Sequence, residues 1–275
     1  MKENRHSQNT IRAALAQTHI LWEDKERNYE IAQERIGEAA RQGADVIFFP
    51  EMSFTGFSMN TDVTGEREKQ TVQLMRTLAR RHNICVGFGW VKDCTRLCGK
   101  CENHYTVVDR AGAVLSDYAK LHPFSYSGED AVFRGGCALA HFVLSGIAFS
   151  SFICYDLRFP EVFQAASQRA HMIVVPANWP AKRSAHWKAL AQARAVENQV
   201  YLLAVNCAGE TGGVHYTGDS CVISPDGEVQ AALSGSEGML IAELTDDVER
   251  VREAFPVKRD RREALYVSLY EGKIF

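Results

Sequence analysis

Apolar and polar positions along the chain follow two periods, which predict two kinds of element. Short, nearly continuous apolar runs bounded by turn residues are typical of buried strands. They occur at residues 11–17, 45–50, 84–91, 105–108, 113–118, 138–144, 147–153, 172–175 and 200–206. Apolar residues at helical spacing predict helices at 25–41, 65–82, 159–170 and 184–198, the last one capped by Ser184. Residues 109–112 and 224–227 are expected to be turns between strands.

The order of these elements predicts the fold class. Strands that alternate with helices indicate an α/β protein whose sheet is covered by helices. Residues 46–51 (VIFFPE) and 172–177 (MIVVPA) resemble each other, because each is an apolar strand that follows a helix and is ended by proline. We therefore expect two similar halves whose sheets stack face to face within a single domain. This domain should span residues 11–275, with a disordered segment at 1–10 and a tail at about 255–275.

Composition and charge narrow the functional classes. Apolar residues make up 46% and charged residues 24% of the 275 positions, which is ordinary for a soluble globular protein. A net charge of −3 gives no reason to expect nucleic acid or an anionic membrane as a partner. We expect neither a secretory signal in residues 1–10 nor a membrane span, which needs about 18 apolar residues in a row. The eight cysteines then indicate reduced thiols and a cytoplasmic protein.

The chemistry centres on Cys154, which ends the buried run 147–153. Pro160 follows where a helix can start. A cysteine between a strand and a helix is exposed at the sheet edge where α/β proteins place reactive side chains. Helix-start N–H groups and a cationic neighbour would lower the pKa of this thiol from about 8.5. The alternative is a small buried hydrophobe, the ordinary role of a free cysteine.

Two further residues supply what a thiol attacking an amide requires, namely a base and a cation for the developing oxyanion. Glu51 ends the second predicted strand and precedes an apolar loop at residues 52–57. Removal from water would favour the neutral form of its carboxyl group, which suits a general base. Lys120 stands between apolar neighbours after the strand at 113–118. Taken alone, each could be a solvated surface residue.

Together, these three segments resemble the nitrilase superfamily of carbon–nitrogen hydrolases. The segments are 49–52 (FPEM), 118–122 (YAKLH) and 153–161 (ICYDLRFPE), and the resemblance extends over about residues 11–266. It implies an α-β-β-α sandwich in which Cys154 is the nucleophile, Glu51 the general base and Lys120 the oxyanion-stabilising cation. The backbone N–H of Tyr155 would be the second oxyanion donor. Glu129, in a variable loop, resembles the second glutamate that steadies the lysine and the substrate.

Other segments resemble the ω-amidase-like branch, whose members hydrolyse the terminal amide of small dicarboxylate monoamides such as 2-oxoglutaramate. These segments are 154–156 (CYD), 176–180 (PANWP), 184–187 (SAHW), 193–199 (ARAVENQ), 216–220 (YTGDS) and 255–262 (FPVKRDRR). Asn178 and Trp179 are expected to line the pocket, whereas Trp187 is expected to pack. The substrate carboxylate needs cations or hydroxyl donors, for which the candidates are Arg183, Lys182, Tyr126 and Tyr216. Arg194 and Glu197 are interpreted as an ion pair on one helix face.

The loop at 94–101 departs from the family pattern. Cys94, Cys98 and Cys101 could form a tetrahedral zinc site with His104, but such tight spacing favours a cysteine-rich surface loop. The proposed mechanism requires no cofactor. The resemblance also implies a homodimer or higher homo-oligomer, with the tail reaching the partner.

Three alternatives remain open at this point. The same triad could act on N-carbamoyl amines or other aliphatic amides, because pocket residues set that choice. A cysteine–histidine hydrolase would use His122 or His186 as the base. A non-catalytic binding protein could retain the fold.

Overall fold

The first of two large sheets is built around three parallel strands. The computed structural model describes residues 9–273, in which this sheet has the order β15-β1-β2-β4-β5-β6, with β3 beside β4. β1, β2 and β4 run parallel, while β15, β5 and β6 pair antiparallel with their neighbours. The strands are β1 (Thr10–Gln17), β2 (Val46–Phe48), β3 (Gly65–Glu66), β4 (Cys85–Lys92), β5 (Glu102–Val108), β6 (Val114–Ala119) and β15 (Gly238–Thr245).

The second sheet repeats this plan in the order β14-β13-β10-β9-β8-β7. Here β9 is the middle of three parallel strands, as β2 is in the first sheet. The predicted likeness of residues 46–51 and 172–177 is explained by the equivalent positions of β2 and β9 in the two sheets. Its strands are β7 (His141–Leu144), β8 (Ile147–Ser151), β9 (Met172–Ala177), β10 (Tyr201–Asn206), β13 (Ser220–Ile223) and β14 (Val229–Leu233). A separate two-stranded ribbon consists of β11 (Ala208–Thr211) and β12 (Val214–Thr217).

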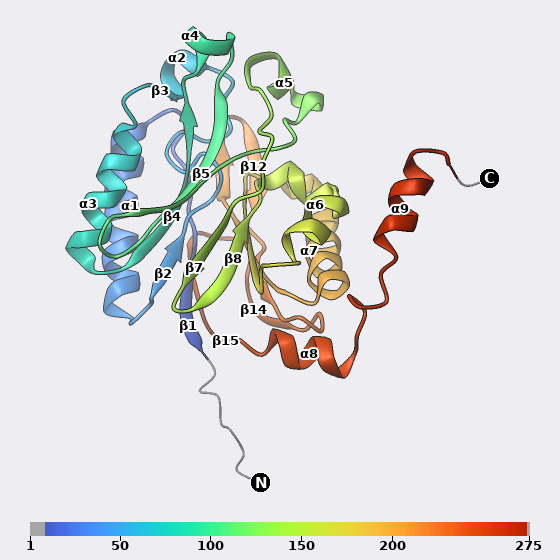
Figure 1. The fold of residues 1–275 in the computed structure, drawn as a ribbon. Helices are drawn as coiled ribbons and strands as arrows, with labels where there is room; N and C mark the ends of the chain where they lie inside the picture. The colour runs from blue at the N-terminus through green and yellow to red at the C-terminus, as the bar shows by residue number, and fades with distance from the viewer. Residues whose placement is uncertain (1–8, 274–275) are drawn as a thin grey trace.

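The two sheets pack against each other, with helices on both outer faces (Figure 1). Between the sheets, the Phe48 ring of β2 lies 6.4 Å from the Phe149 ring of β8. Helices α1 (Lys25–Arg41) and α3 (Gln70–His82) bury apolar faces on the first sheet. Helices α6 (Pro160–Ala166) and α7 (Ser184–Asn198) cover the second. The predicted α/β class, the two stacked halves and the α-β-β-α sandwich are confirmed.

The structure corrects one predicted helix start, one predicted cap and one predicted helix end. The helix expected from residue 65 begins at Gln70, because Gly65 and Glu66 pair with β4. The Glu66 carboxylate instead accepts hydrogen bonds from the backbone N–H and the hydroxyl of Thr71, which caps α3. Ser184 is the first residue of α7 and not its cap, since its hydroxyl donates to Asp219 Oδ2 at 2.7 Å. The helix expected at 159–170 is shorter, ending at Ala166.

Short helices occupy loops near one end of the sandwich, and two more form the tail. The loop helices are α2 (Thr61–Thr64), α4 (Thr95–Cys98), α5 (Glu129–Val132) and the 3-10 turns η1 (Ser125–Ser127), η2 (Cys154–Arg158) and η3 (Ala181–Arg183). In the tail, α8 (Val248–Ala254) packs below the second sheet, whereas α9 (Glu263–Tyr270) extends outward and has no buried residue (Figure 1). Of the segment predicted to be disordered, residues 1–8 lie outside the described residues, and Thr10 already belongs to β1.

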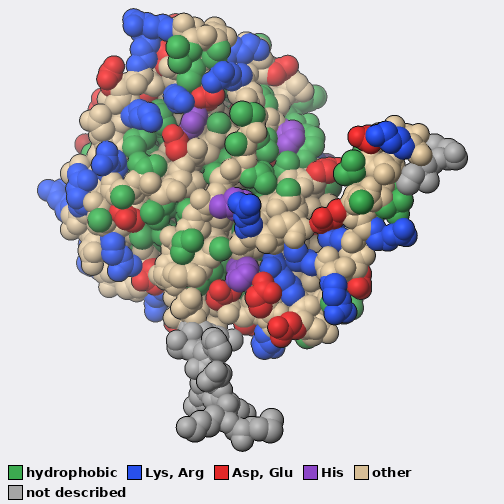
Figure 2. Space-filling model, in the orientation of Figure 1, with side chains coloured by type: hydrophobic (Ala, Val, Ile, Leu, Met, Phe, Trp, Pro, Cys, Tyr) green, Lys and Arg blue, Asp and Glu red, His purple; other side chains and the backbone are tan. Residues whose placement is uncertain are grey.

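The surface agrees with the nearly balanced charge. On the face shown in Figure 2, acidic and basic side chains are mixed and not gathered by sign. Across residues 9–273, no helix combines the length and the apolar character required to cross a membrane.

Candidate active site

Four polar residues converge where strands of both sheets end. Glu51 follows β2, Lys120 follows β6 and Cys154 follows β8, while Glu129 begins α5. Lys120 Nζ lies 2.8 Å from Glu51 Oε1, and 3.1 and 2.9 Å from the two carboxylate oxygens of Glu129. Lys120 is 1% exposed and both glutamates are fully buried. The structure thus brings the predicted lysine and its two carboxylates into one buried ion cluster.

This cluster decides the charge of Lys120. Burial alone would lower the pKa of the Lys120 ammonium group, but the carboxylates of Glu129 and Glu51 outweigh it and raise that pKa above its usual range. Burial and the charge of Glu51 raise the pKa of Glu129, while Lys120 opposes them. Lys120 therefore remains a cation at neutral pH, as the stabilisation of an oxyanion requires.

Cys154 has a strained backbone that presents its side chain beside the cluster. Its φ of 46° lies in the left-handed region, which is uncommon for a residue other than glycine. Strain of this kind persists where surrounding contacts enforce it, and it is frequent at active sites. Here the enforcing contacts come from Asp156, which accepts hydrogen bonds from Ile153 N at 3.0 Å and from the Tyr118 hydroxyl at 2.8 Å. In η2, the backbone N–H of Tyr155 lies in the first turn, where helical N–H groups have no partner within the helix.

The thiol does not have the lowered pKa expected from the sequence. Burial and the nearby negative charge of Glu51 raise the pKa of the Cys154 thiol well above its usual range, and Lys120 opposes them only in part. The prediction of a lowered pKa was wrong because Lys120, the cation beside the sulfur, already shares its charge with two carboxylates. These effects favour the neutral form of the Cys154 thiol, so any reaction of its sulfur requires a neighbouring base to take the proton.

Two contributors to this arrangement were missed from the sequence. Asn103 Nδ2 donates to Glu51 Oε1 at 2.9 Å and to Glu129 Oε1 at 3.1 Å. Asp156, fully buried, secures the turn that carries Cys154. Asn103 stands just before the strand predicted at 105–108, and Asp156 stands two residues after the cysteine, but neither position indicates a partner.

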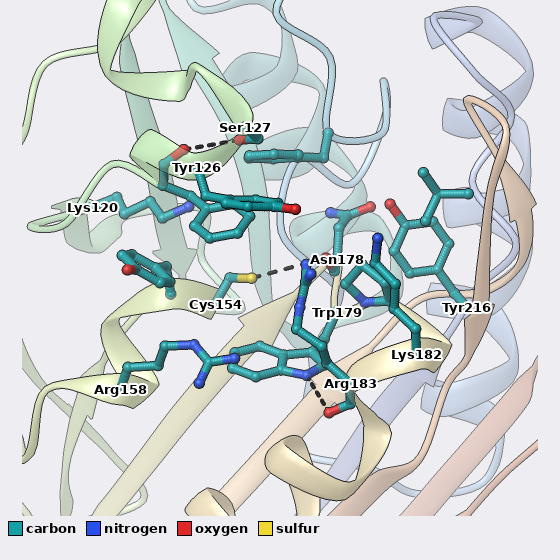
Figure 3. A pocket seen from close by; sticks show the side chains of 15 residues that line it. Lys120, Tyr126, Ser127, Cys154, Arg158, Asn178, Trp179, Lys182, Arg183 and Tyr216 are labelled. Atoms are coloured by element: carbon teal, nitrogen blue, oxygen red, sulfur yellow. Dashed lines mark hydrogen bonds between the residues drawn. The ribbon is translucent and has the colours of Figure 1, made fainter.

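A cavity of about 200 Å³ opens onto Cys154, and both aromatic and cationic side chains line it. Figure 3 shows Cys154 and Lys120 on one side of this cavity and Lys182 and Tyr216 on the other. Asn178 and Trp179 line it, as predicted, and the Asn178 backbone N–H donates to Glu51 Oε2 at 3.0 Å. Tyr126 stands at the mouth, 82% exposed. Trp187, in contrast, is fully buried and packs against Trp179 with ring centroids 5.4 Å apart.

Three cations also line the cavity. Arg183 lies over the Phe124 ring at 5.4 Å, and Arg158 lies over the Trp179 ring at 4.7 Å (Figure 3). Lys182 is exposed at the opposite wall. Unlike Lys120, none of the three has a carboxylate within ion-pair distance among residues 9–273. The cavity therefore offers unneutralised positive charge to a ligand. Arg158 was not among the residues predicted for this role.

Other predicted residues have structural partners. His122 Nδ1 lies 2.7 Å from Asp156 Oδ1 and its ring stacks on Phe159, while His186 contacts Arg158. Neither histidine is part of the described cavity lining, which disfavours a cysteine–histidine hydrolase. Arg194 forms the predicted ion pair with Glu197 at 2.9 Å.

The cysteine-rich loop makes hydrogen bonds of its own. Cys94 Sγ donates to Glu102 Oε2 at 3.3 Å, and Cys98 Sγ lies 3.5 Å from the carbonyl oxygen of Cys94. Between residues 9 and 273, no group of three or more histidine, cysteine, aspartate or glutamate side chains is arranged to hold a metal ion. The alternative zinc site at Cys94, Cys98, Cys101 and His104 thus has no support in the geometry.

Comparison with known proteins defines the class to which this fold and cavity belong. Residues 12–253 match the family model "Carbon-nitrogen hydrolase". The chain belongs to this family, and the predicted resemblance is confirmed.

Individual members of this family are similar to the chain over most of its length. The chain is 33% identical over 233 residues to the 2-oxoglutaramate amidase of Bacillus subtilis, covering 83% of this chain and 89% of that protein. It is 34% identical over 256 residues to the omega-amidase YafV of Escherichia coli K12, covering 92% and 97%. Among solved structures, a mutant amidase from Nesterenkonia sp. AN1 superposes with a TM-score of 0.85 at 25% identity, covering 96% and 97%. That structure is described as showing covalent addition of the acetamide moiety of fluoroacetamide at the active site cysteine.

Proposed function

We propose that this protein is a thiol amidase that hydrolyses the terminal amide of a small dicarboxylic acid monoamide, such as 2-oxoglutaramate, to the acid and ammonia. The observation that carries the proposal is one cavity that holds a cysteine beside a buried Glu–Lys–Glu cluster and three unneutralised cations. The names of the two amidase relatives support the same substrate class. Family membership makes hydrolysis of a carbon–nitrogen bond the reaction type.

In the proposed mechanism, Glu51 takes the proton of the Cys154 thiol as the sulfur attacks the amide carbon. The oxyanion is held by Lys120 and by the backbone N–H of Tyr155. Glu51 then returns the proton to the leaving nitrogen, the C–N bond of the tetrahedral intermediate breaks, and ammonia departs, leaving a thioester on Cys154. Water attacks the thioester by the reverse relay, with Glu51 again as the base. Glu129 keeps Lys120 in place throughout, because it binds that ammonium group through both oxygens.

The cations explain the preference for a substrate with a free carboxylate. Arginine binds carboxylates in a planar, paired geometry, and charged hydrogen bonds are stronger than neutral ones. We assign Arg183 as the main carboxylate ligand, since it is half-buried and stacked on Phe124 inside the cavity. Lys182 and Arg158 supply further positive charge, and Tyr216 offers a hydroxyl group on the same side as Lys182 (Figure 3). Asn178 and Trp179 shape the wall.

The proposal is tested by ammonia release from 2-oxoglutaramate, succinamate, glutamine, an N-carbamoyl amine and a simple nitrile. Wild type is compared with Cys154→Ala and with the matched control Cys98→Ser, an exposed thiol outside the cavity. Release from the dicarboxylate monoamides in wild type and in Cys98→Ser, but not in Cys154→Ala, supports the function. Release from the carbamoyl amine alone would favour the alternative of an N-carbamoyl-amine hydrolase with the same triad.

We also propose a cytoplasmic homodimer. The eight cysteines are all free, which suits a reducing compartment. α9 exposes Val267, Leu269 and Tyr270 and buries no residue within its own chain, as a segment that packs on a partner would. Sedimentation of the full chain and of a chain ending at residue 260 tests this. A dimer lost on truncation supports the proposal, and an unchanged state opposes it.

A further inference from the structure

One buried amide joins the two carboxylates of the catalytic cluster. Both hydrogens of the Asn103 side chain point at anionic oxygens, one at Glu51 Oε1 and one at Glu129 Oε1. Each of these oxygens also accepts a hydrogen bond from Lys120. Asn103 is 1% exposed and lies on β5, where its backbone carbonyl accepts from Lys120 N at 2.9 Å. The amide is therefore fixed between the three charged groups.

The Asn103 amide helps to occupy the hydrogen-bond acceptor sites of both carboxylates. A carboxylate has about four lone-pair sites. On Glu129 all four are engaged, by Lys120 twice, by Asn103 and by the backbone N–H of Phe124. On Glu51, Oε1 is engaged by Lys120 and Asn103, whereas Oε2 accepts only from the backbone N–H of Asn178. Among the described residues, one site is left open on the two carboxylates, and it belongs to Glu51 Oε2.

The cost of this arrangement points to a role other than stability. With both N–H groups directed at carboxylates, Asn103 Oδ1 is buried without a hydrogen-bond partner among the described residues. A buried acceptor left unpaired destabilises the fold. The reverse orientation of the amide would place its oxygen against two anionic oxygens, so the donors determine the orientation. Asn103 thus serves as a double donor although its own oxygen has no partner among the described residues.

We propose that Asn103 is a positioning residue that directs the thiol proton to Oε2 of Glu51 and prevents the paired carboxylates from binding a proton from solvent. The inference rests on the proton transfer from Cys154 to Glu51 in the proposed function. In this step the S–H bond breaks, an O–H bond forms at Oε2, and the sulfur electron pair attacks the electrophile. Without the two amide donors, repulsion between the carboxylates favours uptake of an extra proton, which blocks the base.

The amide contacts Glu51 after β2 and Glu129 on α5, and both carboxylates bind Lys120 after β6. The other ionisable groups that interact with the charge of Glu51 are Cys154 after β8, Cys207 after β10 and Tyr216 on β12. Its neighbours on β5, Glu102 and His104, are hydrogen-bonded to each other and to other partners. A change at Asn103 therefore acts on the catalytic cluster.

The test follows the reaction of Cys154 with iodoacetamide between pH 5 and 10. Alkylation needs the thiol proton to be removed but needs no amide substrate, and mass spectrometry of the peptide containing Cys154 separates it from the other thiols. Wild type is compared with Asn103→Ala, which removes both donors, and with Asn103→Asp, which replaces them by a third carboxyl group. Asn28→Ala is the matched control. Asn28 is equally buried and also uses both N–H groups, but on the carbonyl oxygens of Leu21 and Phe54.

The expected result is a displaced acidic limb of the rate profile. In Asn103→Ala it moves about one pH unit upward, which makes alkylation at a pH on that limb about tenfold slower. The displacement is larger in Asn103→Asp, absent in Asn28→Ala, and the Asn103→Ala rate recovers above the displaced limb. Circular dichroism confirms that each variant is folded at the assay temperature.

A uniform decrease at every pH with an unmoved limb would show a merely structural role and overturn the inference. The same displacement in Asn28→Ala would overturn it too. If the limb moves as expected while no dicarboxylate monoamide is hydrolysed, the inference stands and the substrate proposal fails.

Discussion

Replacing Asp156 with alanine should destabilise the fold more than most single substitutions do. This fully buried carboxylate accepts hydrogen bonds from Ile153 N, from His122 N and from the Tyr118 hydroxyl, and it lies against the His122 ring. The substitution leaves these donors without their acceptor. Removing one partner from a buried charged network costs about 3–5 kcal/mol. For a chain of this size, each kcal/mol lowers the melting temperature by about 2–4 °C, so we expect a decrease of about 10 °C.

Thermal unfolding followed by far-ultraviolet circular dichroism at pH 7 measures this effect. Asp226→Ala is the matched control, because Asp226 also accepts hydrogen bonds, from the Ser224 hydroxyl and from Glu228 N, but lies exposed in a turn. Its change should stay within about 0.5 kcal/mol, as for most surface substitutions. The folded fraction of Asp156→Ala should also have lost activity, since the carboxylate no longer ties the strained turn at Cys154 to Tyr118 and His122. A melting temperature within about 3 °C of wild type would refute the argument that Asp156 organises this turn.

Two further predictions concern the cavity and the acid limit of stability. Arg183→Met should raise KM for dicarboxylate monoamides about 10–100-fold with little change in kcat, because a hydrogen bond to a charged group contributes about 1.5–3 kcal/mol; an equal loss on an uncharged aliphatic amide would contradict the assignment. Burial alone would raise the pKa of Glu102, but hydrogen bonds from His104, Cys94 and Lys92 outweigh it and lower that pKa from 4.5 to about 2. The unfolded chain then binds more protons between these values, so this stabilisation is present above pH 4.5 and is lost as the pH falls toward 2. Unfolding of Glu102→Gln should accordingly depend less on pH in this window than unfolding of wild type, and an identical dependence would exclude this role.

Sequence analysis could locate the site residues that directly follow a predicted strand, because a local apolar pattern fixes where each strand ends. Glu51 and Cys154 follow buried apolar strands, and the ends of parallel strands lie at one edge of a sheet. Lys120 follows the hairpin in the same way. Helix α1 matched its predicted bounds because Asp24 caps it locally, accepting from Arg27 N. The start of α3 was misplaced because it depends on the pairing of residues 65–66 with β4, which no local pattern shows.

The contacts of Asn103 could not be predicted for a different reason. Its side chain reaches Glu51 only because β5 pairs with β4 in one register, and Glu129 only because α5 folds back over the strand ends. A one-residue shift in that register would turn the amide to the opposite face of the sheet. Likewise, the cations that line the cavity are Arg158 of η2 and Lys182 and Arg183 of η3, which are separated in the chain by α6 and β9 and meet only in the fold.

The protonation of Cys154 shows most clearly where local reasoning ends. From the sequence, a helix start and a lysine argue for a thiolate, and both features are present in the structure. The positive charge of Lys120, however, is already balanced by the carboxylates of Glu51 and Glu129, which both bind its ammonium group. Little of that charge is left to stabilise a thiolate. Adding a thiolate would place three anions around one buried cation, which low-dielectric surroundings disfavour. A neutral thiol avoids this excess negative charge. In the proposed reaction, Glu51 accepts the thiol proton only as the sulfur attacks, and the negative charge then develops on the carbonyl oxygen of the substrate. The same cluster therefore keeps the free cysteine protonated and supplies the base for its attack.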